Sequence, residues 1–174
     1  ELNVFVIMGD GDCTSIGAGH WLHALRYNMD LTVLMLDNGI YGLTKNQTSP
    51  TTPQGFKSNT QPKGSFLPAM NPIEIALGVT NASFVAQTVD WNPVHLQATL
   101  MAAHRHPGLS FVRVLARCPH FRGGFFEELQ KDPSRILLLT HSDGIPVDEA
   151  VQRVLKNHQQ HDPSDLAGAR ALAD

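Results

Sequence analysis

Hydrophobic and polar positions follow two kinds of pattern in the first part of the chain. Residues 2–8 (LNVFVIM) and 31–36 (LTVLML) are nearly continuous apolar runs, which are typical of strands buried on both faces of a parallel sheet. Between these runs, apolar residues recur at helical spacing, and Ser15 can cap a helix that continues to about Asn28. A strand, a helix and a second strand in this order predict a right-handed crossover within a parallel sheet.

The pattern changes between residues 39 and 69, where Gly, Pro, Thr, Ser, Asn and Gln dominate. A loop of this length is uncommon in a compact domain unless it is functional or disordered. After it, Asn71 as a cap, Pro72 at the first helical position and Glu74 in the first turn predict the start of a helix. The remaining predicted elements are strands at 82–86 and 109–115 and helices at 93–106, 147–161 and 164–173. We therefore predict an α/β fold with a parallel twisted sheet flanked by helices.

Composition narrows the classes of function. With 174 residues, 42% of them hydrophobic and 17% charged, the chain is long and apolar enough for one domain with a hydrophobic core. Its net charge of -3, with Lys and Arg scattered, argues against nucleic acid as a partner. No apolar stretch reaches the roughly 20 residues that cross a bilayer, so we expect no membrane association. The chain has 2 cysteines, too few for a disulfide framework, and we expect a reducing cytoplasm.

Acidic and amide side chains follow both apolar runs. Asp10 lies in Gly9-Asp10-Gly11-Asp12 directly after the first predicted strand, and Asp37-Asn38 follows the second. If the strands are neighbours, about 4.8 Å apart, these groups meet at the carboxyl edge of the sheet, where ligands collect. Carboxylate, amide and carbonyl oxygens suit Mg²⁺, and the first amides of the following helix suit a phosphate. A tight turn with solvated acids remains an alternative, whereas a dinucleotide-binding turn is disfavoured because the third glycine is missing.

The spacing from the GDG triplet to Asn38 resembles the thiamine diphosphate signature. In that signature an asparagine follows GDG after some two dozen residues. The resemblance implies that Asp10 and Asn38 are side-chain ligands of Mg²⁺ and that the carbonyl of Ile40 is a backbone ligand. The usual pair of asparagines stands here as Asp37-Asn38, so the first position departs and the metal-binding position is kept.

A longer resemblance covers most of residues 3–119. The segments GDGDCTSIGAGHWLHALRYN and DNGIYGLTKNQTSPTTPQG resemble the β subunit of the 2-oxoacid:ferredoxin oxidoreductases, with a GDGD–IG–H–HA–R–N block followed by a YGLTKGQ-SPT block. Later similarity lies in NPIEIALGVTNASFVAQT and SFVRVLARCPHF. Two positions depart: Tyr27 stands where the family often has arginine, and Asn46 where it usually has glycine.

The resemblance implies a thiamine diphosphate-binding fold and oxidative decarboxylation of a 2-oxoacid, 2-oxoglutarate or pyruvate, to an acyl-coenzyme A with electrons passed to ferredoxin. It also implies an α subunit as partner, because the pyrimidine-binding domain resides there. Lys45 is the candidate catalytic residue, near the phosphates or the substrate carboxylate; its alternative is a solvated loop lysine. The residues implied to surround the diphosphate are Gly11, Asp12, Gly42, Leu43 and Thr44.

The same resemblance bears on the cysteines and the organisation of the chain. Cys118 resembles the last ligand of the family's four-iron, four-sulfur cluster, which needs four thiolates and is therefore expected only in the intact chain. Because Glu1 leads directly into a strand, we expect a fragment that lacks its natural N-terminal part. Cys13 is predicted to pack in the core. We divide the chain into a pyrophosphate-binding domain, 1–122, and a C-terminal helical extension, 123–174.

Other functions remain open at this stage. A non-oxidative thiamine diphosphate-dependent decarboxylase or synthase shares the GDG signature but not the YGLTK-Q-SPT loop. A truncated domain that folds without binding a cofactor is the non-catalytic alternative. His20 and His23 lie one helical turn apart, but without a third ligand at clear spacing they favour a helix facing the cofactor or a subunit interface over a metal site.

Overall fold

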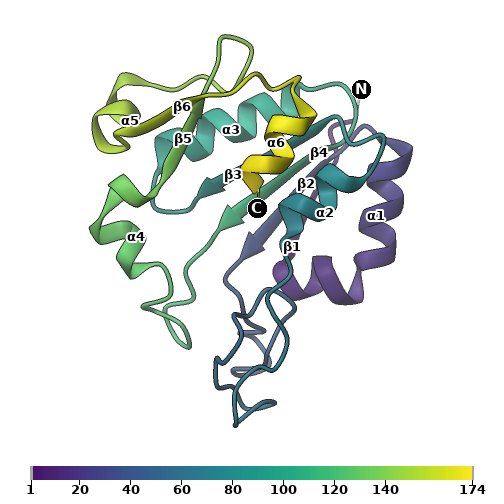
Figure 1. Ribbon diagram of the computed structural model, residues 1–174. Helices are drawn as coiled ribbons and strands as arrows, with labels where there is room; N and C mark the ends of the chain where they lie inside the picture. Colours follow the sequence, from purple (N-terminus) through teal and green to yellow (C-terminus); the bar gives the residue numbers. More distant parts are fainter. Residues whose placement is uncertain (1, 174) are drawn as a thin grey trace.

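The computed structural model describes residues 2–173, and a parallel sheet forms its centre (Figure 1). The sheet has 4 strands in the order β1-β2-β4-β3, and each neighbouring pair is parallel. These strands are β1 (Phe5–Gly9), β2 (Thr32–Asp37), β3 (Phe84–Val89) and β4 (Ser110–Leu115). The predicted α/β class and the predicted pairing of the first two strands are confirmed. Since Gly9 pairs with Leu36, Asp10, which follows β1, and Asp37, the last residue of β2, lie at the same edge of the sheet.

Helices cover the two faces of this sheet. On one face, α1 (Ala18–Tyr27) and α2 (Pro72–Gly78) enclose a core in which the Trp21 ring lies 4.9 Å from that of Phe111. On the other face, α3 (Pro93–Arg105) packs Ala103 against Ala86 and Val112. The predicted start of α2 is confirmed, because the Asn71 side chain accepts a hydrogen bond from the Ile73 amide at 3.1 Å.

The prediction that the first strand is buried on both faces is wrong. β1 is at the edge of the sheet, and Phe5 and Ile7 remain 47% and 64% exposed. Val6 and Met8 point to the covered face and pack against the core there. On the opposite face α3 covers β3 and β4 and meets β1 at Phe5, whose ring lies 5.6 Å from that of His104. The exposed face of β1 is therefore as apolar as the buried one.

The C-terminal part of the chain contains a second, smaller sheet. Strands β5 (Leu137–Thr140) and β6 (Asn157–Gln160) pair in parallel, with α5 (Glu149–Val154) between them. The predicted helix at 147–161 is wrong, because the chain leaves the helix at Val154 while Leu155 stays buried beside Val151. The predicted helical extension at 123–174 is wrong for the same reason, because this part of the chain also contains the strands β5 and β6. The other helices here are α4 (Glu127–Lys131), the short 3-10 turn η2 (Pro133–Arg135) and α6 (Leu166–Ala173).

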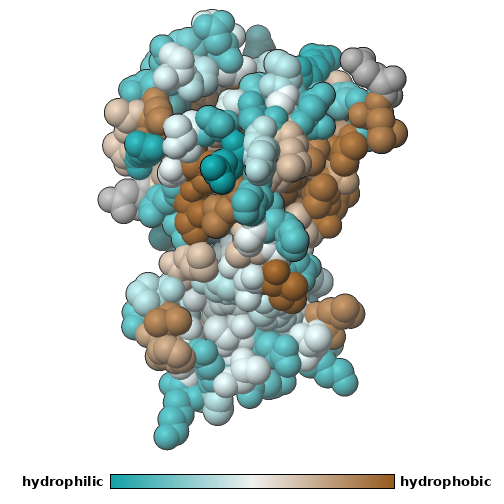
Figure 2. Space-filling view, turned by 90° about the vertical axis from the view of Figure 1, so that its right-hand side faces the viewer, coloured by the Kyte–Doolittle hydropathy of each residue, from teal (hydrophilic) through white to brown (hydrophobic). Residues whose placement is uncertain are grey.

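The segment between β2 and α2 extends from the end of the sheet as a folded loop (Figure 1). Its inner residues Ser49, Thr51 and Thr52 are buried, while Leu43 and Phe66 are 99% and 69% exposed. The lower part of Figure 2, where this loop projects, is mostly hydrophilic with isolated hydrophobic side chains. Among the helices of residues 2–173, none is long and apolar enough to cross a membrane.

Candidate functional site

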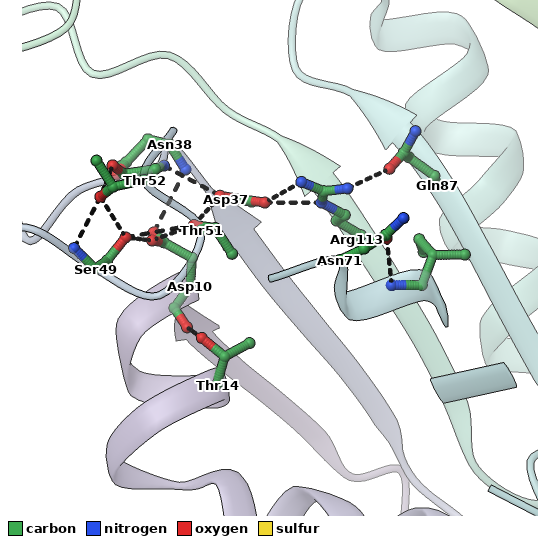
Figure 3. Close-up of polar contacts among 12 residues, drawn as sticks. Asp10, Thr14, Asp37, Asn38, Ser49, Thr51, Thr52, Asn71, Gln87 and Arg113 are labelled. Carbon is green, nitrogen blue, oxygen red and sulfur yellow. Dashed lines mark hydrogen bonds and ion pairs between the residues drawn. The ribbon is translucent and has the colours of Figure 1, made fainter. Parts of the chain in front are cut away.

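Asp10 and Asn38 meet at the carboxyl edge of the sheet (Figure 3). Asp10 follows β1 and is 1% exposed, and Asn38 follows the last residue of β2. The backbone amide of Asn38 donates to Oδ1 of Asp10 at 3.4 Å. The two residues that the sequence singled out as metal ligands are thus brought together by the pairing of their strands.

Hydroxyl groups from the long loop surround the Asp10 carboxylate. Ser49 and Thr51 both donate to Oδ2 of Asp10, Thr51 at 2.8 Å. The Thr51 hydroxyl also lies 2.8 Å from Oδ1 of Asp37. A hydroxyl carries one proton, so Thr51 can donate to only one of the two carboxylates at a time. The sequence analysis did not single out these hydroxyls, although the SPTT segment at 49–52 was the available signal.

The two buried carboxylates have different electrostatic surroundings. Two nitrogens of Arg113, Nε and Nη2, lie 2.7 and 2.6 Å from Oδ2 of Asp37, and Nη1 donates to Gln87 at 3.1 Å. Asp10 forms no ion pair with a basic side chain of the described residues. Burial raises the pKa of the Asp10 carboxyl, and the nearby charge of Asp37 raises it further. A bound cation would remove this penalty, because it compensates the charge at Asp10 directly.

The oxygen atoms at this edge fit a magnesium ion by their chemistry. Asn38 Oδ1 accepts from the Ile40 amide at 3.2 Å, which orders the turn that carries the Ile40 carbonyl. A carboxylate, an amide oxygen and a backbone carbonyl are hard ligands of the kind that Mg²⁺ prefers. Residues 2–173 contain no group of three or more His, Cys, Asp or Glu side chains that could hold a metal. A magnesium site at this edge would therefore have few protein ligands. This is usual for Mg²⁺ when phosphates complete its coordination shell.

A wide helical turn follows Asp10. Residues Asp12–Ile16 form the π-helix η1, and the Thr14 hydroxyl donates to the Asp10 carbonyl at 2.6 Å. The prediction that Ser15 caps the first helix is wrong, since Ser15 lies inside η1 and α1 begins after Gly17. Turns of this kind are frequent at functional sites. The side chain of Asp12 accepts from the Gly9 amide at 3.1 Å.

Gly11 is in contact with a residue that the sequence analysis missed. The Tyr41 hydroxyl donates to the Gly11 carbonyl at 3.1 Å. A Cβ atom at Gly11 would lie 2.1 Å from Cε1 of Tyr41. Only glycine lets the acidic turn and the long loop approach this closely.

The next part of the loop carries most of the remaining candidates. Leu43, Thr44 and Lys45 are exposed, and among the described residues none of their side chains bonds to Asp10 or Asn38. The Thr44 hydroxyl instead donates to Gln47 at 2.7 Å. Lys45 and Asn46 have φ angles of 71° and 59°. Asparagine tolerates this left-handed conformation better than most residues, which explains how it can replace the glycine of the family pattern.

The two cysteines have different surroundings. Cys13 is 0% exposed within the core, as predicted, and burial raises the pKa of its thiol to about 12. Cys118 follows β4, is half-buried and lies beside the loop, since a Cβ at Gly42 would be 3.6 Å from its sulfur. The predicted cluster ligand is therefore next to the predicted diphosphate loop.

Arg122 is a further buried residue of this region that the sequence analysis did not identify. Its Nη1 donates to the Gly39 carbonyl at 2.8 Å, and its own amide donates to the Cys118 carbonyl at 3.0 Å. The guanidinium carbon lies 3.3 Å from the centre of the Phe125 ring and 4.4 Å from that of Phe56. Burial lowers the pKa of Arg122 to about 10, so the group remains charged at neutral pH.

Comparisons with known proteins identify relatives of this arrangement. Residues 1–114 match the family described as "Thiamine pyrophosphate enzyme, C-terminal TPP binding domain". The chain is 41% identical over 147 residues to the 2-oxoglutarate oxidoreductase subunit KorB of Mycobacterium tuberculosis, covering 83% of this chain and 39% of the relative. It is also 41% identical over 121 residues to the 2-oxoacid:ferredoxin oxidoreductase subunit beta of a Sulfolobus species, covering 70% of this chain and 39% of the relative.

A solved structure shares the fold. The 2-oxoglutarate:ferredoxin oxidoreductase from Magnetococcus marinus, with 2-oxoglutarate, coenzyme A and succinyl-CoA bound, superposes with a TM-score of 0.68 at 28% identity. The match covers 96% of this chain and 62% of that one. Of the first curated relatives the chain spans 39%, 44% and 54% of the length. The chain belongs to the thiamine pyrophosphate enzymes, as a C-terminal TPP-binding domain that resembles the β subunits of 2-oxoacid:ferredoxin oxidoreductases.

Proposed function

We propose that this chain is the thiamine diphosphate-binding part of the β subunit of a 2-oxoacid:ferredoxin oxidoreductase. The enzyme converts a 2-oxoacid, 2-oxoglutarate or pyruvate, and coenzyme A into carbon dioxide and an acyl-coenzyme A, and passes the electrons to ferredoxin. The observation that carries the proposal is the buried Asp10 carboxylate, which lies beside Asn38 and has no basic partner among the described residues. The relatives named above support the reaction class.

Asp10, Asn38 and the carbonyl of Ile40 hold Mg²⁺ in this proposal, and the ion binds the diphosphate. Thiamine diphosphate supplies the carbanion chemistry of the decarboxylation when it is bound, so the protein mainly has to bind and orient it. The turn at Gly11 and Asp12 and the loop at 42–44 surround the diphosphate. The exposed Lys45 would supply a positive charge that orients the phosphates or the substrate carboxylate.

Cys118 is one of four thiolate ligands of a four-iron, four-sulfur cluster in this proposal. The sequence has 2 cysteines and Cys13 is buried in the core, so further ligands would come from residues outside these 174. The position of Cys118 beside Gly42 supports the assignment, because it brings the candidate cluster ligand next to the loop proposed to hold the diphosphate. Both cysteines are free, which suits a reducing cytoplasm. The partner is an α subunit that carries the pyrimidine-binding domain.

The test uses the complete protein, purified without oxygen together with its partner subunit. Bound thiamine diphosphate, magnesium, iron and sulfide are measured, and then ferredoxin reduction with 2-oxoglutarate and with pyruvate. We expect Asp10→Ala to lose bound thiamine diphosphate and magnesium, whereas Asp143→Asn, at an 83% exposed carboxylate, retains both. Thiamine diphosphate without iron would move the assignment to a non-oxidative enzyme. If the unmutated protein bound neither cofactor, the proposal would fail.

A further inference from the structure

The backbone of Gly39 is fixed by side chains from three parts of the chain. Its amide donates to Oδ1 of Asp37 at 3.1 Å, within the same turn. Its carbonyl accepts from the Thr52 hydroxyl at 2.7 Å and from Nη1 of Arg122 at 2.8 Å. Gly39 has a φ angle of 66° and separates Asn38 from Ile40, the two proposed magnesium ligands of this turn. The orientation of both ligands depends on the conformation of Gly39.

Arg122 is itself held in one position. It is 7% exposed, and its guanidinium carbon lies over the rings of Phe125 and Phe56, 3.3 and 4.4 Å from their centres. Guanidinium groups stack favourably on aromatic faces, and their planar fork keeps the donor direction fixed. A Cβ atom at position 39 would lie 2.2 Å from Nη1 of Arg122, so the glycine and the arginine are mutually dependent. An exposed or flexible donor could not impose the same geometry.

The same residue connects the turn to the cysteine that follows β4. The Arg122 amide donates to the Cys118 carbonyl at 3.0 Å, and these two residues form an isolated antiparallel bridge. The main chain of Arg122 is thus tied to Cys118, and its side chain is tied to Gly39. No hydrogen bond joins Arg122 to Asp10 or Asp37 within residues 2–173; its charge acts on both carboxylates through space, and its hydrogen bond to the turn is to Gly39.

We propose that Arg122 is a positioning residue, which holds the 38–40 turn in the conformation that binds Mg²⁺ and thiamine diphosphate. The inference rests on the proposed function, because it concerns how that site is kept in shape. Arg122 acts through the carbonyl of Gly39 and is not a catalytic residue. Groups that orient metal ligands without touching the metal commonly change metal affinity about 10–100-fold when they are removed.

The test compares Arg122→Met, Arg122→Lys and Arg117→Gln in the complete protein with its partner subunit, after removal of the cofactors. Two quantities are measured for each variant: the Kd for thiamine diphosphate as a function of magnesium concentration, and the melting temperature of the cofactor-free protein. We expect Arg122→Met to weaken binding about 10–100-fold. Arg122→Lys should recover part of the affinity, because it keeps the charge and one donor. Arg117, whose 46% exposed side chain pairs with Asp90, is the matched control and should change the Kd less than about twofold.

Separate outcomes bear on the two proposals. If Arg122→Met melts at a lower temperature but binds with an unchanged Kd, Arg122 is part of the scaffold alone and the inference is overturned. If the unmutated protein does not bind thiamine diphosphate with magnesium, the proposed function itself fails. Should Arg122→Met not fold, Phe125→Leu removes the nearer stacking ring and carries the same comparison of affinity with melting temperature.

Discussion

Replacing Arg113 by methionine should destabilise the central sheet far more than replacing its partner Asp37 by asparagine. The Asp37 side chain is 2% exposed and that of Arg113 is 20% exposed. In Arg113→Met the carboxylate would keep its bonds from the Gly39 amide and the Thr51 hydroxyl but lose its cation. Removing one partner of a buried ion pair typically costs about 3–5 kcal/mol, because the other charge stays buried without compensation.

The exposure of Arg113 places the expected value at the lower end of that range. Water reaches part of the pair, so we expect Arg113→Met to cost about 3 kcal/mol of local stability. Asp37→Asn should cost about 1 kcal/mol, since asparagine keeps an acceptor oxygen and the arginine can still donate to Gln87 at 3.1 Å. The double variant removes the uncompensated charge, and we therefore expect it to recover about 2 kcal/mol relative to Arg113→Met.

Hydrogen exchange measured on peptides from β2 and β4 of the complete protein reports the local free energy of opening. Arg135→Gln is the control, because the Arg135 side chain is 52% exposed and its pair with Glu128 lies on the surface. Two results would refute the reasoning. The first is a free energy of opening for Arg113→Met within about 1 kcal/mol of that of the unmutated protein. The second is a double variant that exchanges as fast as Arg113→Met, which would show that the charge on Asp37 does not cause the loss of stability.

Three further predictions follow from buried side chains. Phe111→Ala should cost about 3–5 kcal/mol in chemical unfolding, because the ring is 0% exposed and packs on Trp21, and a loss below about 1 kcal/mol would contradict this. Burial lowers the pKa of His95. The stabilising contribution of the neutral His95 is therefore present above its ordinary pKa of 6.5 and is lost as the pH falls through the lowered native pKa. In His95→Gln the melting temperature should depend less on pH over this range. Burial raises the pKa of Cys13 to about 12, so iodoacetamide at pH 8 should label it only after unfolding, as peptide mass spectrometry can show.

The sheet could be predicted from the sequence because its signals are local. Two apolar runs separated by a helical pattern fixed the parallel pairing of β1 with β2, and this pairing placed Asp10 next to Asn38. The burial of β1 could not be predicted in the same way. An apolar run does not reveal whether helices cover the strand on both faces. Here α3 packs mainly on β3 and β4, on the side of the sheet away from β1.

The boundary errors have a physical origin too. Val151 and Leu155 are four residues apart, as on one face of a helix, and both are buried in the small C-terminal core. The backbone nevertheless becomes extended at Leu155, and the exposed residues 157–160 pair with β5. Periodicity reports which side chains are buried, and it cannot show that the helix ends at Val154, before the buried Leu155.

The contacts that complete the candidate site join residues distant in the sequence. Ser49 bonds to Asp10 and Arg122 bonds to Gly39, and no pattern within either segment predicts these pairs. Arg113 did leave a signal, since an arginine within the apolar strand SFVRVL needs a buried partner. Asp37 left the same signal at the end of LTVLML. Matching a buried acid to this buried base would have predicted an ion pair, but the sequence alone offers both Asp10 and Asp37 as the acid.

The pairing of Asp37 with Arg113 also separates the roles of two carboxylates that look equivalent in the sequence. Both acids lie at the ends of neighbouring strands, and the Thr51 hydroxyl lies 2.8 Å from each. Arg113 neutralises Asp37, so an acid can occupy the position where the thiamine diphosphate signature has its first asparagine. Asp10 is buried without an ion pair among the described residues, and this burial raises the pKa of its carboxyl. One uncompensated carboxylate at this edge favours a cation, and a divalent cation retains the positive charge that a diphosphate requires.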